Sequence, residues 1–436
     1  MVEGASEPVY LNRLAYYAEF IHLKDLLFEI DILKHEEETD ELDVILFAES
    51  FQDILDFISY NNLPSTIFFQ LKDVLIRNIV FHTVSHVYIN KLASTVDLSS
   101  IEKKISEGVN SLTLNFSEIA KKSVKNDYYN LIDEVSISES NTMYYPAFYK
   151  KGNSLILFSS VRLINSSGKN FIVPGLVKID LEKRMIYSFL CNKFTGGRSD
   201  ESLVWSISDY QKLLMKKLET AFNIKCSETS KEEEKLYKRN MFESCQKMNR
   251  MLIEDYEEKI LKDMPTIDTH IKHLMSNLNS IVSLSDTDKE KIRKKIISLC
   301  VSEYMTKKVK SLELREKALS KGLSGYPTRI KFSGMDASSS NTKSSGKDHP
   351  LPIHEIFHSL NTSFEYFGSI TEWRIAWFNK YLFPKTRSFG KSTSVSQATI
   401  KISSGSVVVN LLPREKKNEE MVICIVEKVQ SDVKLI

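Results

Sequence analysis

The sequence predicts an α+β protein, mainly helical, with an N-terminal helical bundle, a central antiparallel β meander, long helices and a small C-terminal α+β unit. Three observations predict this class. Apolar residues recur at helical spacing through residues 9–130 and again from residue 206. Short segments rich in Ile, Val, Phe and Tyr lie between these regions. Glycine and proline are scarce, at 14 and 10 of 436 residues, which favours long helices over a turn-rich sandwich.

The N-terminal bundle is expected over residues 1–132. Apolar periodicity predicts helices over 9–35, 41–60 and 67–92, and one or two more over 97–132. The stretch "NNLPST" separates the second helix from the third, which Ser65 or Thr66 would cap. Short connections between such helices indicate an antiparallel arrangement.

The rest of the chain divides into four parts. Residues 133–200 contain the meander, with about four strands over 144–193 separated by "GN", "NSSGKN" and "LEK". Residues 201–332 are long charged helices, and residues 333–350 form a Ser- and Gly-rich flexible linker. Residues 351–436 form the α+β unit, with two short helices and then strands in "ATIKISS", "SVVVNLLP" and "MVICIVEKV".

Several cellular contexts are excluded by composition. The sequence has no run of eighteen apolar residues, so no membrane-spanning helix is expected. The N-terminus lacks the basic and apolar regions of a signal peptide. The five cysteines are odd in number and far apart, which argues for a reducing compartment and against disulfides or a cysteine-rich zinc site. We therefore expect a cytoplasmic protein.

Charge is distributed unevenly along the chain. Residues 1–60 carry fifteen acidic and three basic residues, a balance of −12, although the whole chain is +2. One interpretation is a set of solvated helix faces. The other is a basic surface for RNA or DNA, with the acidic N-terminal region available to a protein partner. The residues predicted to bind nucleic acid are Lys289, Arg293, Lys294, Lys307 and Lys308.

The stretch "VLIRNIVFH" places Arg77, Asn78 and His82 inside an otherwise apolar predicted helix. A histidine can accept a proton from a ribose 2′-hydroxyl near neutral pH. An arginine can hold a phosphate and stabilise the charge that develops during cleavage, and an asparagine can orient either group. These three residues are therefore the predicted catalytic set, and they require no metal or other cofactor.

The pattern R-N-x-x-x-H, late in a helical bundle, resembles the HEPN superfamily of ribonucleases and toxins. The resemblance covers at most about 110 residues and rests on three matched positions, Arg77, Asn78 and His82. It implies metal-independent RNA cleavage by a homodimer, as in a prokaryotic antiviral or toxin system. Two other interpretations stay open: Arg77 paired with an acidic neighbour and His82 satisfied in the core, or His82 and His86 as a metal-binding pair.

A second motif is H-E-x-x-H at His354, Glu355 and His358. In zinc peptidases this spacing presents two histidines and a glutamate on one helical face, and Glu365 or Glu372 would supply a third ligand. Pro352 and the preceding Ser/Gly stretch favour instead a short amphipathic helix. The stretch "FGKSTS" at 389–394 reads as a loop rather than a phosphate-binding motif. Trp373, Trp377 and Tyr381, at helical spacing, are expected in the core.

Three functions follow from these features. The first is a protein that acts on nucleic acid, and its most specific version is a HEPN-like ribonuclease. The second is a nucleic-acid-binding or assembly protein without enzymatic activity. The third, more distant, is a zinc metallopeptidase.

Overall fold

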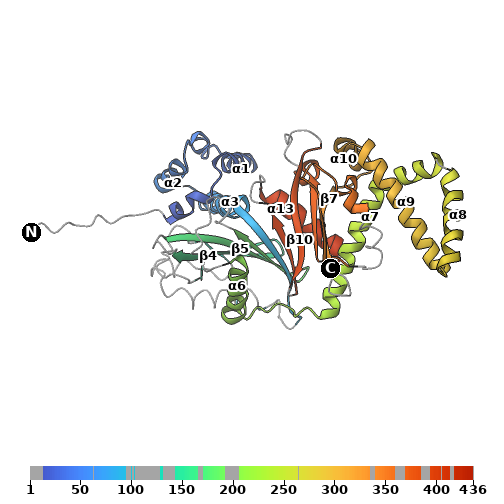
Figure 1. Ribbon diagram of the computed structural model, residues 1–436. Helices are drawn as coiled ribbons and strands as arrows, with labels where there is room; N and C mark the ends of the chain where they lie inside the picture. The colour runs from blue at the N-terminus through green and yellow to red at the C-terminus, as the bar shows by residue number, and fades with distance from the viewer. Residues whose placement is uncertain are drawn as a thin grey trace, which may run out of the picture. The chain divides into compact units, whose positions relative to one another are not determined.

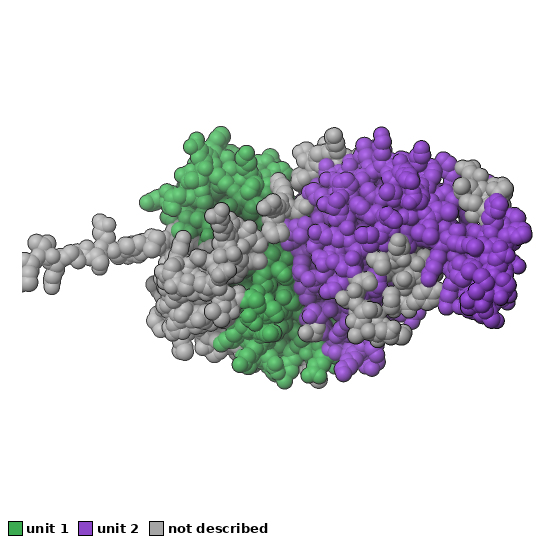
Figure 2. Space-filling model, in the orientation of Figure 1, with its two compact units in different colours: residues 1–228, 416–422 green, residues 229–415, 423–436 purple. Residues whose placement is uncertain are grey.

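The computed structural model (Figure 1) combines runs of helices with runs of antiparallel strands, so the protein is α+β, as the sequence predicts. The structure describes residues 13–61, 63–94, 100, 103, 128–130, 143–164, 170–191, 206–263, 265–333, 339–358, 369–383, 393–403, 405–412 and 417–435. The chain divides into two units (Figure 2): unit 1 comprises residues 1–228 and 416–422, and unit 2 comprises residues 229–415 and 423–436.

Unit 1 begins with helices and continues with strands. Its elements are η1 (Arg13–Phe20), α1 (Leu23–Glu36), η2 (Val44–Phe47), α2 (Phe51–Tyr60), α3 (Ser65–Thr83), β1 (Val84–Lys91), β2 (Tyr128–Asn130), β3 (Met143–Lys151), β4 (Ser154–Ile164), β5 (Asn170–Asp180), β6 (Met185–Cys191) and α6 (Ile207–Phe222). The strands are antiparallel in the order β2-β3-β4-β5-β6-β1. The four strands β3 to β6 lie where the sequence predicts the meander.

Both faces of the unit 1 sheet are covered by helices (Figure 1). On one face, α6 contributes buried Tyr210, Leu214, Leu218 and Phe222 to a core with alternate residues of β4, β5 and β6. On the other face, Phe81 of α3 meets Phe189 edge to face at 5.1 Å between ring centroids. Tyr17 of η1 meets Phe158 in the same way at 5.5 Å. Because both faces are buried, the strands read as nearly continuous apolar runs.

Unit 2 combines a second set of antiparallel strands with long helices. Its elements are α7 (Lys231–Asp263), α8 (Pro265–Ile281), α9 (Asp286–Lys308), α10 (Ser311–Ser320), β7 (Gly325–Ser333), β8 (Ser339–Lys343), η5 (Leu351–Ile353), β9 (Glu372–Phe378), α12 (Asn379–Leu382), β10 (Val395–Ser403), β11 (Ser406–Leu411) and most of α13 (Glu419–Val433). The strand order is β11-β10-β9-β7-β8. Helix α7 packs on β7 and β10, and the side chains of Trp373 and Trp377 are fully buried.

The prediction of a helix over 67–92 is wrong beyond Thr83. Residues 84–91 form β1, which pairs with β6 from Val84↔Cys191 to Lys91↔Met185. Within this segment Val84, Val87 and Ile89 are β-branched and buried, so pairing with an existing strand outweighs the continuing helical periodicity. The first 132 residues therefore include the strands β1 and β2 as well as helices, and β2 lies at the end of the segment predicted to be helical over 97–132.

Three further elements of the C-terminal region differ from expectation. Residues 421–429, predicted as a strand, lie in α13, and residues 372–378, predicted as helical, form β9. Within the predicted linker, residues 339–343 form β8, which pairs with β7. Two predictions fall mostly outside the described residues: the helices over 97–132, and the loop at 389–394.

None of the helices in the described part of the chain is both long enough and apolar enough to cross a membrane.

We expect Gly325→Ala to destabilise unit 2. A Cβ atom at position 325 would clash with the backbone carbonyl oxygen of Ala376 and lie 3.0 Å from the Cα atom of Trp377, both on the paired strand β9. Neither backbone atom can move without disturbing the sheet, so the free energy of unfolding should fall by about 1–3 kcal/mol in a denaturant titration.

Gly346→Ala is the matched control. Its added Cβ would meet only a ring carbon of His349, at an ordinary 3.6 Å. Its stability should stay unchanged or rise by up to about 1 kcal/mol, because alanine lowers the entropy of the unfolded chain. Equal effects of the two substitutions would contradict the packing of β7 on β9.

Candidate functional site

The predicted catalytic residues Arg77, Asn78 and His82 lie in the last two turns of α3. The helix ends at Thr83, so His82 is in its final turn rather than in the middle of a longer helix. The three side chains do not converge on one ligand. Arg77 belongs to a network of carboxylates, whereas Asn78 and His82 both contact His22.

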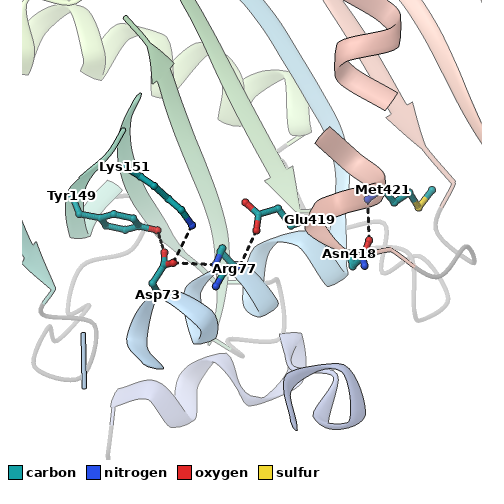
Figure 3. A network of polar contacts seen from close by, with 7 residues as sticks. All are labelled: Asp73, Arg77, Tyr149, Lys151, Asn418, Glu419 and Met421. Carbon is teal, nitrogen blue, oxygen red and sulfur yellow. Dashed lines mark hydrogen bonds and ion pairs between the residues drawn. The ribbon is translucent and has the colours of Figure 1, made fainter. Parts of the chain in front are cut away.

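Arg77 is held between two carboxylates (Figure 3). Its Nε atom lies 3.1 Å from Oδ2 of Asp73, one turn earlier, and its Nη1 atom donates to Oε2 of Glu419 at 3.0 Å. Asp73 also accepts hydrogen bonds from the hydroxyl of Tyr149 and, at 3.4 Å, from the ammonium of Lys151. A guanidinium held between two carboxylates in this way acts as a structural anchor.

Burial and the neighbouring charges shift the pKa values of the groups in and around this network. Burial acts to lower the pKa of Arg77, but Asp73 and Glu419 outweigh that effect and raise it, so the guanidinium stays charged. Burial, helped by Asp73, raises the pKa of Tyr149, whose hydroxyl therefore stays protonated. Burial also raises the pKa of Glu29 to about 7, although Arg77 acts to lower it. Glu29 is thus a carboxyl group that titrates near neutral pH.

Asn78 and His82 both contact His22, the residue that immediately precedes α1. Asn78 is 3% exposed, and its Oδ1 atom accepts a hydrogen bond from the backbone N–H of His22 at 3.1 Å. The rings of His22 and His82 stack with centroids 4.5 Å apart. Nδ1 of His22 in turn lies 2.9 Å from Oδ2 of Asp25. Asn78 therefore positions His22, and His82 and Asp25 flank it.

Sequence reasoning did not identify His22 and Asp25. The available signal is local: a histidine immediately before an apolar-periodic segment, with an aspartate three residues later on the same helical face. What the sequence cannot show is that α1 and α3 lie side by side, which brings His22 to His82.

The other histidine predictions have different outcomes. His86 lies in β1, next to Ser85 Oγ at 2.9 Å from its Nδ1, so it is not one helical turn from His82. His358 is buried, with its Nε2 atom 2.7 Å from the carbonyl oxygen of Pro352, and Glu355 is exposed. Among the described residues, His354, Glu355 and His358 do not form a metal-binding group; Glu365 lies outside that part of the chain.

A basic groove lies between α7 and α9 in unit 2. It is a pocket of about 340 Å³ lined by Gln246, Asn249, Arg250, Ile253, Glu257, Leu261, Glu290, Lys291, Arg293, Lys294, Lys295, Ile297 and Ser298. Five of these residues are cationic and two are acidic. We call these lining residues the α7–α9 groove. An excess of positive charge around a concave surface attracts anions, and concavity strengthens the local potential.

Helix capping and helix packing position the cations of the groove. Helix α9 begins with a capping box in which the Ser285 hydroxyl accepts from the backbone N–H of Asp288, so the first turn is fixed. The α9 lining residues lie within the first four turns, and Arg250 faces them from the middle of α7. The apolar residues Ile253, Leu261 and Ile297 lie among the charges.

The five residues predicted to bind nucleic acid separate into two groups. Arg293 and Lys294 line the α7–α9 groove, where Nη1 of Arg293 lies 3.9 Å from Oε1 of Glu290. Lys289 pairs with Asp286 at 3.1 Å, and Lys307 pairs with Glu303 at 2.7 Å. Lys307 and Lys308 end α9, about 20 Å along the helix axis from Lys294. The sequence missed Arg250, because nothing local shows that the middle of α7 faces α9.

Comparison with protein-family models finds no match for this chain, and comparison with curated proteins finds none either.

Arg77→Ala should lower the free energy of unfolding by about 2–4 kcal/mol. The substitution leaves Asp73 and Glu419 without their shared cation in a partly buried site, and an uncompensated buried charge is costly. Chemical denaturation at pH 8 measures the loss. The control is Arg239→Ala, which breaks an exposed pair with Glu243 on α7 and should cost no more than about 0.5 kcal/mol. An Arg77 variant as stable as the wild type would contradict the anchoring role.

Glu29→Gln should stabilise the protein in alkaline but not in acidic solution. The native pKa of about 7 lies above the ordinary value of 4.5, so the folded protein binds more protons than the unfolded chain between these values. The stability that Glu29 contributes is therefore lost as pH rises through this range, by about 3 kcal/mol. Chemical denaturation at pH 5 and pH 8 should show that Glu29→Gln has a higher free energy of unfolding than the wild type only at pH 8. A gain of the same size at both values would contradict the raised pKa.

Proposed function

We propose that this protein binds nucleic acid and that the α7–α9 groove is the surface that holds the phosphodiester backbone. The observation that carries the proposal is the placement of Arg250 on α7 opposite Lys291, Arg293, Lys294 and Lys295 on α9, around one pocket. Neutralising phosphates with lysine and arginine releases counterions, which supplies most of the free energy of sequence-independent binding.

The side chains of the groove favour backbone contacts over base recognition. Among its lining residues there is no aromatic side chain on which a base would stack. The amides of Gln246 and Asn249 are the main neutral polar groups beside the cations. We therefore infer binding with little sequence preference, with arginine and lysine setting affinity.

Catalysis by Arg77, Asn78 and His82 is not part of the proposal. Arg77 is ion-paired with Asp73 and Glu419, and Asn78 is buried with its Oδ1 atom accepting from the backbone N–H of His22. An arginine that stabilises a cleaving phosphate would instead need its donors free for the substrate. The test is cleavage of labelled RNA in the presence of EDTA by the wild type, Arg77→Ala and His82→Ala. Cleavage by the wild type that is lost in both variants would favour a HEPN-like ribonuclease over a protein that only binds nucleic acid.

The double substitution Arg293→Ala with Lys294→Ala should weaken binding roughly tenfold, because two phosphate contacts are lost. Fluorescence anisotropy with a labelled, mixed-sequence single-stranded RNA measures the dissociation constant across a salt series. The slope of log K against log salt should become shallower by about 1.4, the value for two contacts on a single strand. A matched single-stranded DNA tests whether the sugar matters.

The matched control is Lys307→Ala with Lys308→Ala, which removes the same number of charges from the same helix but far from the groove. It should change the dissociation constant less than twofold. Equal losses in the two variants would show that only the net charge of α9 matters. Absence of salt-sensitive binding by the wild type would reject the proposed function.

A further inference from the structure

Three potential metal ligands meet in unit 1 where α1 begins and α3 ends. They are His22, Asp25 and His82, and one donor atom from each lies within 4.8 Å of the other two. His22 and Asp25 come from the start of α1, and His82 comes from the final turn of α3. The cluster is separate in sequence and in unit from the α7–α9 groove.

The separations in the cluster are near those between metal ligands, although the two imidazole rings, now stacked at an interplanar angle of 26°, must turn for both lone pairs to face one ion. Two ligands bound to Zn²⁺ at about 2.0–2.1 Å lie roughly 3.3 Å apart. Nδ1 of His22 and Oδ2 of Asp25 are already 2.9 Å apart. Closing the widest separation in the cluster, at most 4.8 Å, requires a movement of about 1.5 Å, which side-chain rotation can supply.

The Nδ1 atom of His82 is buried and has no hydrogen-bond partner among the described residues. The same ring meets the backbone of Lys417. Because Nδ1 has no hydrogen-bond partner, Nε2 is the ring nitrogen that meets the backbone of Lys417. Metal-binding histidines are oriented in this way, by a contact at the ring nitrogen that does not bind the metal.

The surroundings also hold the other ligands. Asn78 binds the backbone N–H of His22 and so fixes the start of α1. His82 is partly buried and stacks on the ring of His22, so both imidazoles lie in the same place. The three polar residues that stood out in "VLIRNIVFH" thus include one potential ligand, His82, and one positioning residue, Asn78.

We propose that His22, Asp25 and His82 bind a divalent transition-metal ion, with Zn²⁺ as the first ion to test. Two imidazoles and one carboxylate suit Zn²⁺ and its neighbours in the series, whereas Ca²⁺ and Mg²⁺ prefer sites built from oxygen alone. Three protein ligands leave a fourth position for water. The ion would join the beginning of α1 to the end of α3. This inference does not depend on nucleic-acid binding.

The test uses the full chain, stripped of metal with a chelator and titrated with Zn²⁺ against a competing chromophoric chelator. The wild type should bind one equivalent at this site, and its Tm should rise with Zn²⁺ concentration. His82→Gln and Asp25→Asn should each bind at least 100-fold more weakly and lose the rise in Tm. His86→Gln, on the adjacent strand, should behave as the wild type, and so should His354→Gln, which tests the H-E-x-x-H motif.

A second measurement covers the case in which the ligand variants fail to fold. X-ray absorption of the Zn²⁺-loaded wild type should show two imidazole ligands, oxygen in the remaining positions and no sulfur, and the same spectrum in His354→Gln. Loss of the imidazole signal in His354→Gln, sulfur coordination, or Zn²⁺ affinity unchanged in folded His82→Gln would overturn the proposal. Failure of the wild type to bind Zn²⁺ at micromolar concentration would overturn it as well.

Discussion

Burial of both faces of the unit 1 sheet is the constraint on which the rest of that unit depends. Helix α6 covers one face, and α3 covers the other through contacts such as Phe81 with Phe189. Helix α1 packs on α3 in turn, so α3 is enclosed and the polar side chains along its flank have little access to water. Buried polar groups must find partners inside the protein.

This constraint explains the polar residues within an apolar helix. Asp73 and Arg77, one turn apart, form an ion pair. Asp73 also contacts Tyr149 and Lys151, and Arg77 also pairs with Glu419. Asn78 and His82, again one turn apart, pair instead with the chain entering α1. The two sets lie along one helix but serve different neighbours. Glu29 connects them electrostatically, because its pKa responds to Arg77 and also to Asp25.

Charge has opposite roles in the two units. In unit 1 the charges near α3 are compensated by neighbours, which fixes how the helices pack. In unit 2 the cations of the α7–α9 groove outnumber its carboxylates, so the surface is suited to an external anion. The length of α7, at 33 residues, lets the same helix pack on β7 and β10 and also form one wall of the groove.

The sequence predicts correctly the elements in which a regular apolar pattern is bounded by turn residues nearby in the chain. It fails for elements whose conformation depends on contacts with segments far away in the sequence. Strands β3 to β6 alternate and are separated by short turns, so they could be located. Residues 84–91 keep a helical pattern, yet they form a strand that pairs with β6. Residues 421–429 are rich in β-branched side chains, yet they form a helix. For the sites, Arg293 and Lys294 were predicted, whereas Arg250, His22 and Asp25 depend on contacts between helices.

Residues 416–422 belong to unit 1 although nearly 190 residues of unit 2 precede them, from Thr229 to Glu415. Glu419 completes the pairing of Arg77, and Lys417 holds the ring of His82. During synthesis, the first 228 residues emerge from the ribosome long before these two partners exist. Until residues 416–422 are made, Arg77 has only one of its two carboxylates, Asp73, and the ring of His82 lacks its contact with Lys417. Unit 1 therefore cannot complete its folding in vectorial order, because part of it is made only after residues 229–415 of unit 2.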